Sequence, residues 1–135
     1  MGNRKRNSSI ISKNLKSSSN ISSLKKCPLS PRKTRLVADT VRGLQVDKAL
    51  SILQFTPNVA ARYIEKLLLN AISCYQEKNG DIDAKDSIVV IKSIHVDSAV
   101  MLKRLRTAPQ GRGHRIRKRS NHITIELEQF STQKN

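Results

Sequence analysis

The spacing of hydrophobic residues divides the chain into a helical part followed by a part made of strands. From residue 30 to residue 79, apolar side chains recur every three or four positions, which is the pattern of helices with one buried face. This pattern predicts three helices, over about 30–43, 47–55 and 57–79. Beyond Gly80 the period changes to two, which is typical of strands with one buried face.

The first predicted helix has a packing side and a cationic side. Ser30 is expected to cap it, Pro31 suits its first position because no N–H partner is needed there, and Gly43 supplies a stop. At 100° per residue, the packing side collects Leu36, Val37, Thr40, Val41 and Leu44. The other side collects Arg32, Arg35, Asp39 and Arg42, and Lys33 reaches outward from the first turn.

Two strands are predicted near the end of the chain, with a long hairpin between them. In the first strand, Ile88, Val90, Ile94 and Val96 are expected on one face, with Val89, Ile91 and His95 on the other. In the second, Ile123, Ile125 and Leu127 point inward and His122, Thr124, Glu126 and Glu128 outward. If these strands pair antiparallel, residues from about 98 to 122 form a hairpin with a turn at Pro109-Gln110-Gly111.

Charge is distributed unevenly along the chain and indicates a polyanionic partner. The net charge is +16, from 26 basic and 10 acidic residues. Residues 1–29 hold seven basic and no acidic residues, 30–97 hold ten and eight, and 98–135 hold nine and two. A nearly balanced middle with cationic ends is typical of nucleic-acid binding.

The composition also predicts the domain organisation. Residues 1–27 form a basic arm rich in Ser and Asn, which we expect to be disordered alone and to order against nucleic acid. A start of this composition is also typical of an organellar transit peptide, and that alternative stays open. Residues 28–128 are expected to form one globular domain that includes the hairpin, and 129–135 a short tail.

The strongest functional signal is the stretch from Lys103 to Arg119, which carries eight cations and no carboxylate. A ribbon this polar cannot bury enough apolar surface to hold its own shape, because isolated two-stranded hairpins are marginally stable even with an apolar face. Arginine forks suit phosphate oxygens, and the lack of aromatic residues argues against base stacking. We therefore predict an RNA-binding hairpin, with a solvated flexible loop as the alternative.

No pattern indicates a metal, a cofactor or a catalytic centre. Cys27 and Cys74 form no Cys-x-x-Cys pair, so a reducing cytoplasm is expected. Two sets of possible metal ligands lack a complete coordination pattern, namely His95, His114 and His122, and Asp81, Asp83 and Asp86. No apolar run reaches the roughly 18 residues of a membrane span. We expect a soluble protein that is not an enzyme.

Several short strings between Ser30 and Glu128 resemble the family of ribosomal large-subunit protein twenty-two. They are Ser30-Pro31-Arg32-Lys33, Arg35-Leu36-Val37-Ala38-Asp39, Arg42-Gly43, Val96-Asp97, Lys103-Arg104, Gly111-Arg112, and Lys118-Arg119-Ser120-Asn121-His122-Ile123-Thr124. The resemblance implies an α+β fold in which three helices pack on a small antiparallel sheet of about three strands, with a long protruding basic β-hairpin.

The resemblance also implies a structural role in the large subunit of the cytoplasmic ribosome. The expected partners are large-subunit rRNA, neighbouring ribosomal proteins and the nascent peptide, because the hairpin of this family lines the exit tunnel near the macrolide site. The candidate rRNA-binding residues are Arg32, Lys33, Arg35, Arg42, Lys103, Arg104, Arg106, Arg112, Arg115, Arg117, Lys118, Arg119, Asn121 and His122. The candidate tunnel tip is Thr107, Ala108, Pro109, Gln110, Gly111, Arg112 and Gly113.

This sequence departs from the family pattern in two places. Two positions of the tip that are usually cationic are neutral here. Before Ser30, the usual basic strand is replaced by Lys25-Lys26-Cys27-Pro28-Leu29, so the third strand is expected to be short or at an edge.

Two other function classes were weighed. A DNA-binding regulator would use residues 30–55 as a helix-turn-helix pair and the hairpin as a minor-groove arm. An RNA-processing enzyme would need a nucleophile with its base, a carboxylate pair or a phosphate loop, which the sequence lacks.

Overall fold

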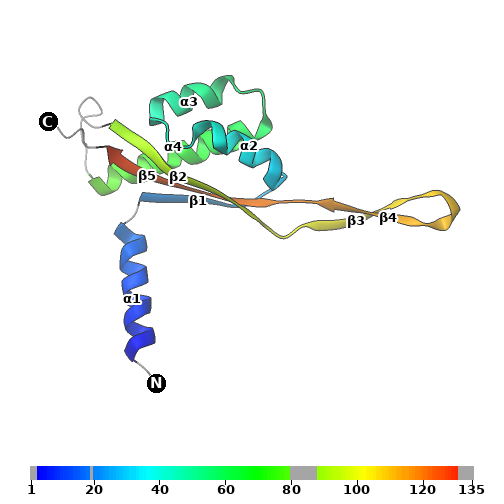
Figure 1. Ribbon diagram of the computed structural model, residues 1–135, viewed down its shortest axis with the longest axis horizontal. Coiled ribbons are helices and arrows are strands. Elements are labelled where there is room, and N and C mark those ends of the chain that lie inside the picture. The colour runs from blue at the N-terminus through cyan, green and yellow to red at the C-terminus, as the bar shows by residue number, and fades with distance from the viewer. Residues whose placement is uncertain (1–2, 19, 80–87, 131–135) are drawn as a thin grey trace.

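The computed structural model describes residues 3–18, 20–79 and 88–130 (Figure 1). The elements are α1 (Asn3–Ser18), β1 (Asn20–Cys27), α2 (Pro31–Val41), α3 (Val46–Phe55), α4 (Val59–Asn79), β2 (Ile88–Ser98), β3 (Leu102–Thr107), a 3-10 turn (Pro109–Gly111), β4 (Gly113–Lys118) and β5 (Asn121–Phe130). The predicted α+β class is confirmed, and the three predicted helices correspond to α2, α3 and α4.

A three-stranded antiparallel sheet forms the base of the body. Its order is β1-β5-β2, so β5 is the central strand and β1 and β2 are the edges. Helices α2, α3 and α4 cover one face of this sheet, and the β3–β4 hairpin extends the ribbon of β2 and β5 far beyond the body (Figure 1). The core between sheet and helices is aliphatic, with Ile64 and Leu68 of α4 against Ile94, Ile123 and Ile125. Burial of these side chains stabilises the body by roughly 1.5–3 kcal/mol each.

The register of β2 differs from the prediction because the strand contains a bulge. Its pairing with β5 shifts between Ile91 and Ser93, which adds one residue to the β2 side. Ile91 therefore shares the core face with Ile94 and Val96, although simple alternation predicted it on the opposite face. Val90, predicted on the core face, is only half-buried.

The packing side of α2 is also rotated relative to the prediction. Leu36, predicted to pack, is 64% exposed, and Thr40 is exposed as well. Thr34 is fully buried in their place, together with Val37 and Val41. The helix begins at Pro31 as predicted, but the Ser30 side chain makes no capping hydrogen bond. Gly43 follows the helix with a φ of 76°, a backbone conformation that glycine adopts without strain.

The last part of the predicted N-terminal arm, residues 20–27, forms strand β1 of the sheet. Strand β1 is eight residues long and pairs with β5 along one edge, and it ends directly before Pro28. Ser22 and Cys27 of this strand are buried on the helix side. The predicted edge position of this strand is thus confirmed.

Some of the predicted features lie outside the residues that the structure describes. Asp81, Asp83 and Asp86 are outside them, as are 131–135 of the predicted tail. Among the described residues, no three His, Cys, Asp or Glu side chains are placed to hold a metal ion. None of the described helices combines the length and the apolar character needed to cross a membrane.

Both cysteines are free thiols, and Cys27 is only 2% exposed. Burial raises the pKa of the Cys27 thiol, an effect that a backbone hydrogen bond at Leu29 opposes more weakly. A protonated, shielded thiol reacts slowly. We expect iodoacetamide at neutral pH to leave Cys27 unmodified in the folded protein and to label it after unfolding, as measured by peptide mass spectrometry. Half-buried Cys74 is the internal comparison, and native labelling of Cys27 as fast as Cys74 would contradict its buried position.

Candidate nucleic-acid interface

The β3–β4 hairpin holds most of the predicted binding residues. Its strands pair in register from Leu102 opposite Lys118 to Thr107 opposite Gly113. Every side chain of both strands is exposed, so the ribbon is shaped by its backbone ladder and not by packing. A ribbon of this kind needs an external partner to be rigid.

The pairing distributes cations over both faces of the hairpin. Because directly opposite residues point to the same side, one face carries Arg104, Arg106 and Lys118. The other face carries Lys103, Arg115 and Arg117. Lys103 lies opposite Arg117, a pair of like charges that destabilises the free ribbon. Neither face resembles a protein core, and both are suited to anions.

The tip is a tight turn formed by Pro109, Gln110, Gly111 and Arg112. The Arg112 N–H donates to the Pro109 carbonyl at 3.5 Å, and the Ala108 N–H donates to the Arg112 carbonyl at 2.8 Å. Gln110 and Gly111 have φ values of 62° and 71°, as in a type I′ hairpin turn. Glycine suits position 111 because L side chains rarely adopt a φ of 71°, and not because space is short, since a Cβ there would meet no atom of the chain within 4 Å.

The hairpin joins the body through an irregular segment on each strand. Ala99 donates from its N–H to the Ser120 carbonyl at 2.9 Å, and the Ser120 hydroxyl donates to the Val100 carbonyl at 2.5 Å. Exposed Arg119 lies in this joint, between the cations of the ribbon and the body. Exposed cations therefore follow the chain from the hairpin to Arg119, two residues before β5.

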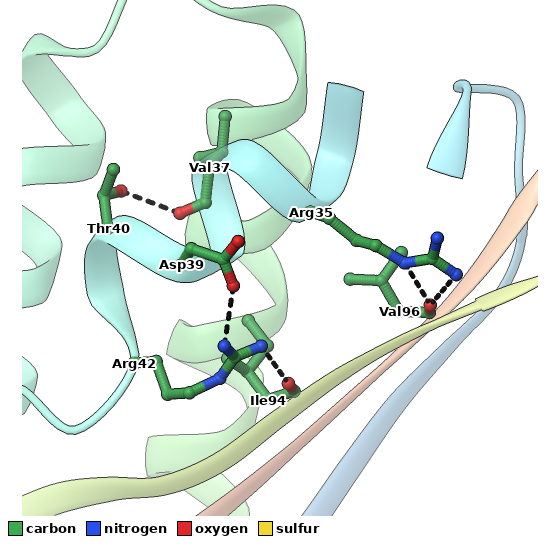
Figure 2. Close-up of polar contacts among 7 residues, drawn as sticks. All are labelled: Arg35, Val37, Asp39, Thr40, Arg42, Ile94 and Val96. Atoms are coloured by element: carbon green, nitrogen blue, oxygen red, sulfur yellow. Dashed lines mark hydrogen bonds and ion pairs between the residues drawn. The ribbon is translucent and has the colours of Figure 1, made fainter. Parts of the chain in front are cut away.

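Two of the predicted cations on α2 contact the protein itself (Figure 2). Arg35 donates from Nε and Nη2 to the Val96 carbonyl at 3.1 and 3.0 Å. Arg42 donates from Nη2 to the Ile94 carbonyl at 3.2 Å, and its Nη1 lies 2.6 Å from Asp39 Oδ1. Arg32 and Lys33, in the first turn, are exposed.

These contacts explain what Arg35 and Arg42 do in the free chain. Strand β2 is an edge, so its outward carbonyls have no partner strand. The Gly43 N–H donates to the Ile91 carbonyl at 3.1 Å, and the Ile91 N–H donates to the Leu44 carbonyl at 3.0 Å. Together with the two guanidinium groups, this turn covers the open edge of β2. In the sequence, Arg35 and Arg42 lie two helical turns apart at the border of the buried stripe of α2, and this spacing is compatible with a shared contact to β2.

Loss of the Arg35 contact should destabilise the fold. We expect Arg35→Ala to lower the free energy of unfolding by about 1 kcal/mol, because a charged donor to a partly exposed carbonyl is lost. Arg32→Ala removes the same charge from the same helix and should change it by less than about 0.5 kcal/mol. Urea unfolding of the two variants measures the difference, and equal effects would contradict the edge-covering role.

Asn121, one of the candidate rRNA-binding residues, is buried in the structure. Its side chain is 0% exposed, and Nδ2 donates to the Leu29 carbonyl at 3.0 Å and to Thr34 Oγ1 at 2.9 Å. The Thr34 hydroxyl in turn donates to the Ser30 carbonyl at 3.1 Å. These bonds connect the start of β5 to the first turn of α2. Nothing in the sequence indicated this burial, because the neighbouring residues Ser120 and His122 are polar.

His122 follows on the open face of the sheet and is half-buried. Its Nδ1 accepts a hydrogen bond from the Lys26 N–H at 3.0 Å. When the imidazole is neutral, this acceptor places the proton on Nε2. His122 can therefore donate from Nε2 to a phosphate or a carbonyl.

The opposite end of the sheet has a different electrostatic character. Lys92 lies 3.2 Å from Glu126 and 3.8 Å from Glu128. The hydrogen bond to Glu126, with the charges of Glu126 and Glu128, raises the pKa of Lys92. The body thus pairs its charges internally at this end, while the hairpin carries unpaired cations.

Known proteins resemble this chain over most of its length. A profile of the family described as "Ribosomal protein L22p/L17e" matches residues 22–128. The chain is 52% identical over 127 residues to "Large ribosomal subunit protein uL22" of Flavobacterium johnsoniae, covering 94% of this chain and 93% of that protein. It is 45% identical over 135 residues to the protein of the same name from Porphyromonas gingivalis, covering 100% of both.

The comparisons decide between the function classes that the sequence left open. Family members are ribosomal proteins, so neither a DNA-binding regulator nor an RNA-processing enzyme is needed to explain the cationic hairpin. The P. gingivalis protein matches from the first residue, so it contains a counterpart of α1. The matched residues include the body and the whole hairpin, and on this basis the chain belongs to the ribosomal protein L22p/L17e family.

Proposed function

We propose that this protein is a structural, non-catalytic constituent of the large subunit of the cytoplasmic ribosome, where its hairpin and exposed cations bind and bridge large-subunit rRNA. The observation that carries this proposal is a ribbon with three strand cations on each face, no buried side chain and no carboxylate. RNA phosphates on both sides would neutralise the cations and hold the ribbon rigid.

Bridging follows from the two-sided distribution of charge. A ribbon that lay on the surface of one RNA segment would need cations on one face only. Here Arg106 and Arg115, for example, point to opposite sides, so each face can contact a different RNA segment. Exposed Arg32 and Lys33, at the start of α2, add a contact near the base of the hairpin. Neighbouring ribosomal proteins are further expected partners of the body.

The position of the tip in the exit tunnel is the finer part of the proposal. It is supported by family membership and by the distance to which the hairpin projects from the body (Figure 1). Between Thr107 and Gly113, Arg112 is the single cation, and the other side chains are small or neutral. Such a surface suits a channel wall that a nascent peptide must pass without binding tightly.

A crosslinking experiment in assembled subunits tests the bridging role. Leu105 and Ile116 are exposed apolar residues on opposite faces of the hairpin, so a photoreactive aliphatic residue at either position removes no cation. We expect both probes to crosslink to rRNA, at different nucleotides. The same probe at exposed Leu69 on α4 serves as the control for random contact. Absence of RNA crosslinks from both hairpin positions would overturn the proposed function.

A second probe tests the tunnel position separately. A photoreactive residue at Gln110 should crosslink to the nascent chain in ribosomes stalled on a long message. If it reacts only with rRNA, whatever the length of the nascent chain, the tip does not line the peptide path. That result would leave the rRNA-bridging role in place.

A further inference from the structure

Helix α1 stands apart from the rest of the protein. In Figure 1 it leaves the end of the sheet remote from the hairpin and points away from both the sheet and the helical layer. All side chains described in it, from Asn3 to Asn14, are exposed. It also precedes residue 22, where the match to the family profile begins. A contact made by α1 is therefore additional to those of the shared domain.

An isolated helix with this sequence needs a partner to persist. Helices of about 15 residues are marginal in water even when rich in alanine, and α1 has 16 residues with no alanine. Five of them are serine and three are asparagine, which favour turns and caps over helix interiors. No acidic residue lies in its first turn to favour the helix dipole.

The chemistry of α1 identifies the partner as an anion. Its cations Arg4, Lys5, Arg6 and Lys13 are exposed, and the helix contains no carboxylate. Only Ile10 and Ile11 offer apolar surface among the described side chains, and their directions differ by 100° around the helix. Within residues 3–14, these two divergent isoleucines do not form the apolar stripe that docking on another protein requires.

The shape of α1 is also suited to a phosphate backbone. A shallow hollow runs along one side, lined by Ser8, Ser9 and Ser12 and flanked at one end by Arg4 and Lys5. Short serine side chains let a ligand approach closely and donate O–H hydrogen bonds to phosphate oxygens. The guanidinium of Arg4 can bind two such oxygens at once.

We propose that α1 is a second RNA-binding element, which folds onto a sugar–phosphate backbone that lies along the hollow lined by Ser8, Ser9 and Ser12, called the serine groove below. The inference rests on the proposed function, because the RNA concerned is the rRNA of the same subunit. The α1 site is separate from the hairpin, since the two elements leave the body in different directions (Figure 1). The free chain would then carry a largely unfolded α1 and the bound chain an ordered one.

Hydrogen exchange of the full-length protein, free and within purified large subunits, measures this ordering. The amides of α1 should exchange without protection in the free protein and at least about 100-fold more slowly in the subunit, as expected when local opening becomes unfavourable. The β3–β4 amides report on the hairpin in the same sample. Protection of the hairpin without α1 would overturn this inference alone, whereas protection of neither would overturn the proposed function.

Matched variants test the groove itself. Arg4→Gln with Lys5→Gln removes the cations beside the serines, and Arg6→Gln with Lys13→Gln removes the same charge from another side of the helix. We expect the first pair to abolish the protection of α1 in subunits and the second to preserve most of it. Equal losses would overturn the groove as the contact site.

A crosslinking measurement identifies the bound polymer. A photoreactive aliphatic residue at Ile11, one residue before Ser12, changes little in size or charge. We expect it to crosslink to rRNA more efficiently than the same probe at Ile10, and at nucleotides distinct from those reached by the hairpin probes. Crosslinks from Ile11 to protein alone would overturn the assignment.

Discussion

Replacing Arg115, Arg117 and Arg119 together with alanine should sharply reduce incorporation of the protein into large subunits, by at least about tenfold at near-physiological salt. These residues lie on one face of β4 and in the joint below it, and all are exposed. Each phosphate contact contributes close to one unit to the slope of log affinity against log salt, so the variant should flatten that slope by about two to three. Quantitative mass spectrometry of subunits assembled in competition with the unchanged protein measures the loss.

The isolated variant should unfold like the original protein, because all three side chains are exposed. The matched control removes the same charge from the helical layer by replacing exposed Lys48, Arg62 and Lys66 with alanine. It should be incorporated at near-normal levels. If both triple variants lose incorporation equally, net charge and not the hairpin would be responsible for binding.

Most helices and strands could be predicted because the spacing of apolar residues reflects the geometry of a single helix or strand. The alternation of Ile123, Ile125 and Leu127 in β5 is regular, and all three side chains are buried as predicted. In β2 the same alternation held for Ile94 and Val96 but failed for Val90 and Ile91, on the other side of the bulge, because a bulge is a property of two paired strands and cannot be seen in the sequence of one. Strand β1 was predicted only as a short or edge strand near Lys25–Leu29, and its start at Asn20 was missed because Ser22, a polar residue, occupies one of its buried positions.

In the candidate site too, some features were predictable from the sequence and others depended on packing. The hairpin was predictable because a run of cations without carboxylates indicates an anionic partner in any backbone conformation. The structure adds that both faces of the hairpin carry cations. Arg35 and Arg42 were predicted as free cations, since nothing in the sequence shows that the carbonyls of Val96 and Ile94 lie within their reach. A cation at the border of a buried stripe has two possible directions, and only packing decides between them.

Asn121 was assigned to the binding surface for a related reason. It lies within a string that resembles the ribosomal family, and a role in rRNA binding was expected from that resemblance. The structure instead buries its amide where two acceptors from the segment before and within α2 converge. The short sequence motifs that resemble the family therefore contain residues that maintain the fold as well as residues suited to RNA. The sequence alone does not separate the two kinds.

This difference predicts that Asn121→Ala acts on stability. The substitution leaves the Leu29 carbonyl and the Thr34 hydroxyl without the donor that now serves both, in a position closed to water. Buried polar groups that lose a partner cost about 1–3 kcal/mol each, partly offset because Asn121 Oδ1 itself has no partner among the described residues. We expect a loss of about 2–3 kcal/mol, and a fall in Tm of roughly 6–12 °C in a thermal melt of the full-length protein.

A matched asparagine separates this effect from the loss of any amide. Asn79 donates from Nδ2 to the Tyr75 carbonyl at 3.0 Å from an exposed position at the end of α4, so Asn79→Ala should cost less than about 1 kcal/mol. Thr34→Val tests the network, because its effect should not add fully to that of Asn121→Ala when the two residues share one hydrogen bond. If Asn121→Ala melts like the original protein but fails to enter subunits, the side chain binds RNA and its buried role is wrong.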